Sequence, residues 1–410
     1  MKVLVVDNGQ SVAFARTLGQ SNLFERVGYY ASWQEDTPVA QEMAIGSGFP
    51  EIVREYDLFD ALDAYDCIAC PVLFWDGLQR WCRKRGIPCW GAGETEHLER
   101  DRVKLLATMT ALGMSTPAWE HRTLPDIKPD IEEGDIVKFS TFRGDVETTK
   151  HDGDWTWYYE TMLRWGPLAE SIKAVWQKPL PKGVEPGFDL LVVRGEVLEP
   201  FSVGYEVKDG GYIEKNMLLH EMPQQFRAIY KGIKQMISKD YSNFLSTEIL
   251  SETLLDITCR IPQPPGDLKL FMWEGLSEII HDHFSNLPYQ LRHTEPRDTW
   301  GVQLIAHNNN PKNFCRFGTI PRDIRPFVFF NRAFMVDDCV WTAPWKDRSV
   351  QDWVDAATVV GSGRSPEEAI SEAQRIADEL HMPNGVLIDS GTTEALMKAL
   401  EDGEKEGIAL

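Results

Sequence analysis

Positive charge is scarce in this sequence, which has 42 lysines and arginines against 63 aspartates and glutamates and a net charge of −21 over 410 residues. Attraction to nucleic-acid phosphates or to anionic membranes needs clustered positive charge, so this balance excludes a general nucleic-acid or membrane-surface binder. Long apolar runs are absent too, so no membrane span is expected. The first residues, MKVLVVDNG, are typical of a strand and not of a secretory signal.

Cysteine is also sparse. The seven cysteines are odd in number and irregularly spaced, which predicts reduced thiols and a cytoplasmic location. Cys67 and Cys70 have a C-x-x-C spacing, but Cys67 lies inside an apolar segment, so buried thiols are favoured over a zinc ribbon. His281 and His283 are two residues apart in a predicted helix and do not share a face, so a metal pair is not expected there.

Apolar residues are plentiful, at 43%, and the length predicts two or three domains with sizeable cores. Residues 1–100 alternate predicted strands (3–6, 66–69, 86–91) with predicted helices (11–18, 78–84). This rhythm predicts a parallel sheet with ligands at the carboxyl ends of its strands. No G-x-G-x-x-G motif is present, so no dinucleotide-binding fingerprint is inferred.

The rest of the chain is expected to be α+β. A helix is predicted at 99–112, with Gly113 as its stop. Further predicted strands are 135–139, 174–178, 189–193, 196–201, 243–249, 253–258, 302–307 and 327–334, and further predicted helices are 268–284 and 366–379. Gly195 predicts a hairpin turn between two of these strands. The acidic tail at 401–406 is predicted to be a solvated, frayed end.

The strongest chemical signal is Glu248 together with the strand that follows it. Asp256, Thr258 and Arg260 alternate and point to one face of that strand, and a hairpin would bring Glu248 near Asp256. Two carboxylates held close are unfavourable unless a cation lies between them, and oxygen ligands suit Mg²⁺. Arg260 could then hold a phosphate in a bidentate contact. A surface hairpin with a cross-strand ion pair is an equally acceptable interpretation.

Two weaker signals precede this one. Lys138 lies on a short apolar strand, where it needs an anion partner or access to water, and the turn after it holds Arg143 and one glycine, so its backbone N–H groups could cradle phosphates. An extended hinge containing Gln177 and Lys178 could offer backbone groups to an adenine edge, and Glu185 could accept from ribose hydroxyls. The alternatives are an edge-strand lysine and an inter-strand loop, and the loop is favoured when the hinge is taken alone.

In this order the signals resemble the ATP-grasp superfamily, most closely its phosphoribosylamine–glycine ligase branch, over nearly the whole chain. The strand 255–260 is similar to the acid-x-Asn-x-Arg metal strand of the family. The other segments that carry the resemblance are 1–9, 65–71, 76–78, 89–91, 98–104, 362–364 and 367–377.

The resemblance implies an α/β and α+β fold in three parts. An N-terminal parallel-sheet, Rossmann-like pre-ATP-grasp domain would span 1–98. A two-subdomain ATP-grasp domain would span 99–325, with a nucleotide lid at about 118–180, and a small closing subdomain would span 326–410. ATP and Mg²⁺, or Mn²⁺ in its place, are the implied cofactors.

The resemblance also implies roles for the candidate residues. Lys138 would bind the α-phosphate side, and Arg102 or Lys104 would replace the second ATP-binding lysine, with Arg102 favoured. Arg143, Gln177, Lys178 and Glu185 would complete the nucleotide site. Glu248, Asp256 and Thr258 would carry the metal, although Thr258 stands where the family has asparagine. Arg260 would steady the transferring phosphoryl group or the acyl phosphate.

The implied reaction joins a small-molecule carboxylate to an amine. The carboxylate would attack the γ-phosphate and the amine would attack the acyl phosphate, which yields an amide, ADP and phosphate. An ATP-grasp kinase and a degenerate nucleotide-binding or regulatory protein are the alternatives. Segments 8–11 and 71–73 lack residues that line the amine pocket in the branch, so phosphoribosylamine is not the expected amine. No oligomeric state is predicted.

Overall fold

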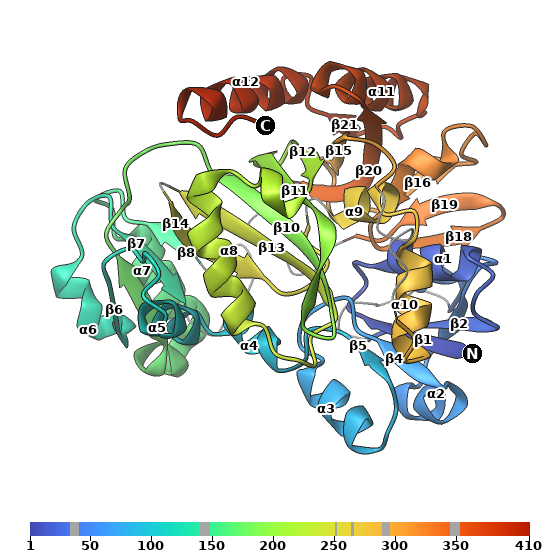
Figure 1. Cartoon of the computed structure of the whole chain (residues 1–410), viewed down its shortest axis with the longest axis horizontal. Helices are drawn as coiled ribbons and strands as arrows, with labels where there is room; N and C mark the ends of the chain where they lie inside the picture. Colours follow the sequence, from blue (N-terminus) through green and yellow to red (C-terminus); the bar gives the residue numbers. More distant parts are fainter. Residues whose placement is uncertain (33–40, 140–147, 251, 264–265, 289–295, 345–352) are drawn as a thin grey trace.

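The computed structural model describes residues 1–32, 41–139, 148–250, 252–263, 266–288, 296–344 and 353–410 (Figure 1). The predicted N-terminal parallel sheet is confirmed, with strand order β3-β2-β1-β4-β5. Its strands are β1 (Lys2–Asp7), β2 (Arg26–Ala31), β3 (Val53–Glu55), β4 (Cys67–Ala69) and β5 (Cys89–Trp90), and its helices are α1 (Val12–Gln20), α2 (Leu58–Ala64) and α3 (Asp76–Lys84).

Residues 118–180, the segment predicted to be a nucleotide lid, contain a small four-stranded sheet of order β6-β9-β7-β8. Its elements are β6 (Trp119–Thr123), α6 (Leu124–Ile127), β7 (Ile136–Phe139), β8 (Thr148–Lys150), α7 (Thr156–Trp165) and β9 (Lys173–Gln177). Val137, Phe139 and Ala174 of the sheet pack with Tyr158 of α7 in a separate hydrophobic cluster. The lid therefore has a core of its own, and in Figure 1 it lies at one end of the molecule.

The central sheet has the order β14-β13-β10-β11-β12-β15-β20-β17, with β21 paired to β15. Its strands are β10 (Pro186–Val193), β11 (Glu196–Val207), β12 (Gly211–Met217), β13 (Asn243–Leu250), β14 (Thr253–Thr258), β15 (Trp300–Asn308), β17 (Val328–Phe330), β20 (Val354–Gly363) and β21 (Val386–Ile388). Three of these strands come from 326–410, so that segment contributes to the central sheet and also supplies two strands to a smaller sheet.

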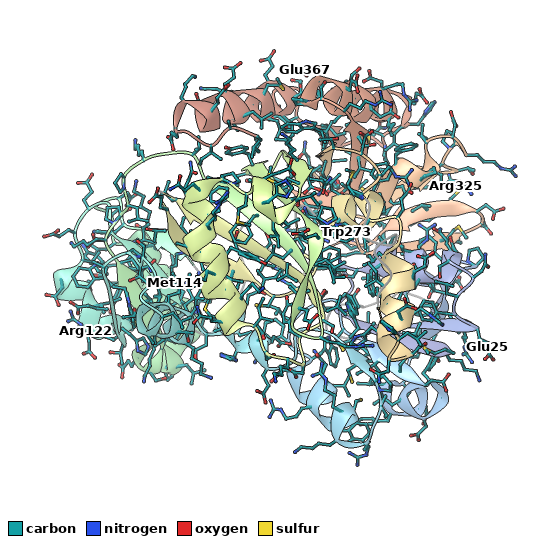
Figure 2. All side chains as sticks on the ribbon, viewed as in Figure 1. Glu25, Met114, Arg122, Trp273, Arg325 and Glu367 are labelled. Atoms are coloured by element: carbon teal, nitrogen blue, oxygen red, sulfur yellow. The ribbon has the colours of Figure 1, made fainter. Side chains whose placement is uncertain are left out.

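Helices cover both faces of the central sheet. Helices α8 (Gln224–Met236), α11 (Pro366–Glu379) and α12 (Thr392–Lys405) pack on one face, and α9 (Gly266–Met272) and α10 (Leu276–Phe284) pack on the other, toward the N-terminal domain. Figure 2 shows Trp273 in the interior of this second layer, whereas Glu25, Arg122 and Glu367 lie at the periphery. A three-stranded sheet of β16 (Cys315–Gly318), β19 (Cys339–Thr342) and β18 (Ala333–Val336) lies beside the N-terminal domain.

Several predicted elements are shorter than expected. The helix predicted at 99–112 is two helices, α4 (Glu96–Arg100) and α5 (Arg102–Ala111), because Asp101 is extended and its carboxylate caps α5 by accepting from Val103 and Lys104. The helix predicted at 268–284 is broken between α9 and α10. The strand predicted at 327–334 divides into β17 and β18, which join different sheets, and Arg332 between them has a φ of +52°.

The prediction of a frayed acidic tail at 401–406 is wrong. Helix α12 continues to Lys405, and Gly403 packs against the buried ring of Tyr205 on β11. The Glu406 carboxylate accepts from the Val184 N–H at 3.3 Å. Packing of the opposite, apolar side of the helix outweighs the repulsion between its acids, so the tail is a structural element.

All seven cysteines are buried and none forms a disulfide. His281 packs against Phe24 while His283 contacts the carbonyl oxygen of Cys89, so the two rings point in different directions, as predicted. In the described part of the chain, no helix has the length and apolar character that crossing a bilayer requires.

Candidate active site

The hairpin of β13 and β14 forms as the sequence predicts. Glu248 lies directly opposite Asp256, and Ser246 lies opposite Thr258. Directly opposed residues of an antiparallel pair share a face, so all four side chains lie on one face of the central sheet. Asp256 is nearly buried, whereas the Glu248 side chain is open to solvent. The two carboxylates therefore project from the sheet as an adjacent pair.

Arg102 approaches this pair from the start of α5. Its Nη2 is 2.9 Å from Oδ2 of Asp256, and only 5% of its side chain is exposed. Asp101 caps the N-terminus of α5, so Arg102 is the first residue of the helix, and its side chain is buried. Of the two candidates for the second cation, the structure brings Arg102 to the acidic pair. Lys104 is exposed on the outer side of α5, 3.9 Å from Asp101.

Lys138 approaches from the lid. It lies on β7, opposite Val175 of β9 and Thr148 of β8. The Glu248 side chain is exposed, but the protein around it removes part of the water near the carboxylate. This partial loss of water and the charge of Asp256 raise the pKa of Glu248 to about 7, while the charges of Lys138 and Arg102 oppose the rise. The charge of Lys138 therefore reaches the Glu248 carboxylate, which places the lysine on the same side of the molecule as the hairpin acids.

Two further acids, Glu206 and Glu185, interact with Glu248 of the carboxylate pair through their charges. Withdrawal of water and the charge of Glu248 raise the pKa of Glu206 to about 7, although the Glu206 side chain remains open to solvent on one side. Glu185, at the end of the hinge, contributes to the raised pKa of both carboxylates. The charge of Glu185 thus reaches both carboxylates, while its predicted contact with ribose stays a prediction. Glu206 was not selected from the sequence, where its only signal is its position near the end of a predicted strand pair.

Arg260 lies beyond the end of β14, where the central sheet meets the N-terminal domain. Its Nε donates to Oε1 of the buried Glu99 at 3.0 Å, and the Cys259 N–H donates to the other oxygen of the same carboxylate. The Ile261 N–H donates to the carbonyl oxygen of Pro71 at 3.0 Å. Glu99 therefore fixes the direction of the Arg260 side chain, a role that the sequence did not reveal.

The remaining candidates take other positions. Lys178 is committed to the lid, where its Nζ is 2.7 Å from Glu132 and 3.1 Å from Asp135, and Gln177 is buried at the end of β9. The backbone at this hinge still leads directly into Glu185 and β10, so its predicted contact with adenine concerns main-chain atoms and stays a prediction. Arg143 lies outside the described residues.

The acidic pair is suited to a magnesium ion that also binds phosphate oxygens, and, in the ranges that the structure covers, it is not part of a complete protein metal site. Among the described residues, no group of three or more His, Cys, Asp or Glu side chains is arranged to hold a metal ion. Mg²⁺ commonly takes one or two carboxylates and completes its shell with phosphate oxygens and water. Glu248 and Asp256 supply such a pair on one face of the hairpin.

Solved structures with a similar arrangement of elements include ligases and carboxylases. Phosphoribosylamine–glycine ligase from Thermotoga maritima matches with a TM-score of 0.66 and 17% identity, over 94% of this chain and 98% of that one. The chain has the ATP-grasp fold. L-amino acid ligase from Bacillus licheniformis matches with a TM-score of 0.60 and 16% identity, over 93% and 98% of the two chains. Biotin carboxylase from Campylobacter jejuni matches with a TM-score of 0.62 and 11% identity, over 99% of this chain and 96% of that one.

Sequence comparison adds no closer relative, because no protein-family model and no curated protein matches. At 11–17% identity the structural similarity establishes the ATP-grasp fold and not a particular reaction. The predicted resemblance to the ATP-grasp superfamily and the predicted fold class are therefore confirmed at the level of the fold.

Proposed function

We propose that this ATP-grasp protein is an ATP-dependent carboxylate–amine ligase, which forms an amide through an acyl phosphate and releases ADP and phosphate. One observation carries the proposal. Glu248 lies directly opposite Asp256 on the hairpin of β13 and β14, Arg102 on α5 is 2.9 Å from Asp256, and the charge of Lys138 on β7 lowers the pKa of Glu248. Cations from two separate elements and a carboxylate pair around one cleft are suited to a nucleotide triphosphate and its metal ion.

Each residue then has a definite task. Lys138 and Arg102 neutralise phosphate oxygens, and Glu248, Asp256 and the Thr258 hydroxyl hold Mg²⁺ or Mn²⁺. The metal, when bound, supplies further neutralisation of the phosphate charge. Arg260, oriented by Glu99, steadies the transferring phosphoryl group. Catalysis by such a site consists of charge neutralisation and alignment, without a covalent nucleophile from the protein.

The substrates are proposed by class. They are a small carboxylate and a small amine, and the altered segments 8–11 and 71–73 argue against phosphoribosylamine. The hinge after Gln177 would present backbone groups to adenine, with Glu185 near the ribose. Seven unpaired thiols support a cytoplasmic location.

The test is a screen of amino acids against carboxylic acids, read as ADP release. The proposed ligase releases ADP only when both a carboxylate and an amine are present. A kinase would release ADP without the amine. A nucleotide-binding protein without turnover would bind Mg-ATP and release no ADP with any pair, and the ion pair that already occupies Asp256 favours this second candidate. Absence of Mg-ATP binding would refute both.

A further inference from the structure

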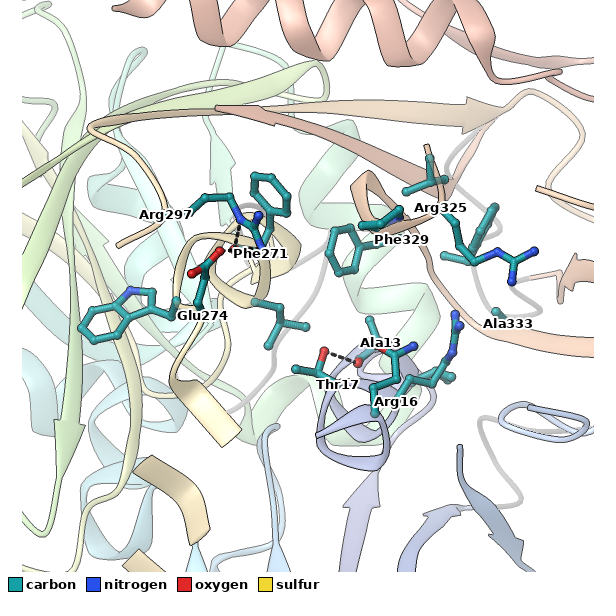
Figure 3. A pocket seen from close by; sticks show the side chains of 16 residues that line it. Ala13, Arg16, Thr17, Phe271, Glu274, Arg297, Arg325, Phe329 and Ala333 are labelled. Atoms are coloured by element: carbon teal, nitrogen blue, oxygen red, sulfur yellow. Dashed lines mark hydrogen bonds and ion pairs between the residues drawn. The ribbon is translucent and has the colours of Figure 1, made fainter. Parts of the chain in front are cut away.

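A cavity of about 370 Å³ lies apart from the candidate active site, where α1, α9 and the segment 325–333 meet (Figure 3). Glu248, Asp256 and Arg102 are not among the residues that line it. Its volume falls in the range of small-molecule sites. Three segments that are far apart in the sequence form its walls, so the cavity depends on the complete fold.

The upper wall of the cavity in Figure 3 is aromatic. Phe271 comes from α9 and Phe329 from β17, and Figure 3 shows both rings above the cavity, with Thr17 of α1 below it. Leu270 and the buried Trp273 add further apolar surface. Such walls suit a flat apolar ring, which aromatic side chains contact over a large area.

Three arginines also line the cavity. Arg16 pairs with Glu51 at 2.9 Å, and its Nε is buried without a hydrogen-bond partner among the described residues. Arg297 pairs with Glu274 at 3.0 Å. These two guanidinium groups are therefore balanced by two carboxylates.

The third, Arg325, is not balanced. Its Nη2 donates to the carbonyl oxygen of Ile320 at 3.1 Å, and no carboxylate in the described ranges forms an ion pair with it. Figure 3 shows Arg325 and Arg16 on the same side of the cavity, and Arg297 with Glu274 on the opposite side. The Arg325 guanidinium is thus a positive charge without a paired carboxylate from the described residues, beside the aromatic wall.

We propose that this cavity binds a small aromatic monocarboxylate, with its carboxylate between Arg16 and Arg325 and its ring against Phe271 and Phe329. A guanidinium group matches the planar geometry of a carboxylate and can contact both of its oxygens. A single negative charge balances the one uncompensated guanidinium, whereas a doubly charged phosphate would exceed it. The proposal does not depend on the ligase activity.

The probe is 3-phenylpropionate, titrated calorimetrically into the full chain. Arg325→Ala weakens its binding on the order of 10-fold or more, because the charge-assisted contact is lost. The uncharged 3-phenylpropanamide, which has the same ring, binds more weakly by a similar factor. Arg322→Ala, which removes a neighbouring exposed arginine outside the cavity, leaves the binding unchanged.

Several results would overturn the proposal. One is the absence of binding heat up to about 10 mM of 3-phenylpropionate, which exceeds the range of specific affinities. Another is equal binding of the acid by the parent chain and by Arg325→Ala. A third is loss of binding in Glu248→Gln, which would place the probe in the candidate active site and not in this cavity.

Discussion

Asp256 is the acid on which the proposed nucleotide site depends most, because it both faces Glu248 and pairs with Arg102. Asp256→Asn keeps the size of the side chain and an oxygen for Arg102 but removes the charge that a metal ion requires. We expect Mg-ATP-dependent ADP release to fall on the order of 100-fold, as for other losses of electrostatic stabilisation, while the melting temperature stays close to that of the parent.

Glu252→Gln is the matched control, since Glu252 is an exposed acid in the turn of the same hairpin. It should retain parental activity. Full activity of Asp256→Asn would refute the metal-binding role of Asp256, and collapse of its fold would instead assign Asp256 a structural role with Arg102.

Asp267 predicts a pH dependence of stability. It is buried at the start of α9, and withdrawal of water raises its pKa to about 7, with a hydrogen bond to Thr358 acting against the rise and the charge of Asp355 adding to it. Because the folded-state pKa exceeds the unfolded value, the folded state holds the proton more tightly. The contribution of Asp267 to stability is therefore most favourable below pH 4 and declines as the pH rises from about 4 to 7.

Asp267→Asn removes this titration and keeps a hydrogen-bonding group for Thr358. Relative to the parent, the free energy of unfolding of the variant should rise by about 2–3 kcal/mol between pH 5 and pH 8. Urea denaturation at the two pH values measures the difference. The exposed Asp323→Asn should track the parent at both, and parallel curves for Asp267→Asn would contradict the prediction.

How far the sequence reveals single site residues depends on how locally each is placed. Glu248 and Asp256 could be predicted because a short hairpin pairs them, and alternation along the strand assigns their face. Glu206 and Glu99 could not, because β11 reaches the site only through the order of the central sheet, and α4 meets Arg260 across 161 residues of sequence. The partial loss of water and the charge of Glu248 that raise the pKa of Glu206 likewise arise only in the assembled fold.

Strand pairs and helix breaks likewise differ in how clearly the local sequence reveals them. The hairpin of β10 and β11 was predicted from Gly195, and Arg194 and Gly195 indeed both have positive φ values, of 53° and 76°. The break between α4 and α5 was missed, since the apolar pattern runs through Asp101 and only its capping contacts reveal the boundary. Helix α12 was missed because its acids concealed an apolar side that needs β11 as a partner.

The docking of α12 on β11 predicts a sharp effect at Gly403. A Cβ atom built there would lie 1.9 Å from the hydroxyl oxygen of Tyr205, which is itself buried. Gly403→Ala should therefore lower the free energy of unfolding by about 1–3 kcal/mol, despite the better helix propensity of alanine. Chemical denaturation measures the change.

Gly77→Ala is the matched control in helix α3, where an added Cβ would meet nothing within 4 Å. It should stabilise the protein by about 0.5–1 kcal/mol through propensity alone. If both substitutions stabilise the protein equally, α12 is not packed against Tyr205.

The contact between α9 and the central sheet contains a buried charge cluster. Lys269 lies 2.8 Å from Asp189 and also contacts Glu214 and Ser202, and the side chains of all three charged residues are at most 1% exposed. Lys269→Met would leave two carboxylates buried without their cation. We expect a loss of about 3–5 kcal/mol in the free energy of unfolding, measured with urea.

The double variant Lys269→Met with Glu214→Gln tests the cause. Removing one of the stranded charges should recover part of the loss, because the penalty arises from uncompensated charge and not from packing alone. No recovery in the double variant would assign the effect of Lys269→Met to packing.

As one body, the protein combines a parallel sheet, a lid and a large mixed sheet, and the sequence revealed these parts better than their connections. The parallel sheet follows from the strand–helix rhythm, and the lid has its own hydrophobic cluster. The central sheet joins strands from 186 to 388, with β10 beside β13 and β20 beside β15. Such pairings join segments distant in the chain, and no local pattern specifies them.

The same architecture predicts how the whole molecule responds to nucleotide. Lys138 belongs to the lid and Glu248 to the central sheet, so Mg-ATP bound in the cleft contacts both walls. A ligand that binds only the folded state stabilises it by about 2.7 kcal/mol at a concentration 100 times its dissociation constant. We therefore expect millimolar Mg-ATP to raise the melting temperature of the parent chain, and Lys138→Met and Glu248→Gln each to reduce that rise.

Lys104→Met separates the cleft from a general effect of positive charge. Lys104 neighbours Arg102 in sequence but is exposed on the outer side of α5 beside Asp101, so its loss should leave the Mg-ATP-induced rise intact. If only Lys138→Met reduces the rise in melting temperature, the nucleotide binds to the lid and does not contact the hairpin acids. Reduction by Lys104→Met as strongly as by the two cleft variants would mean that ATP binds the outer surface of α5, and the cleft would lose its assignment.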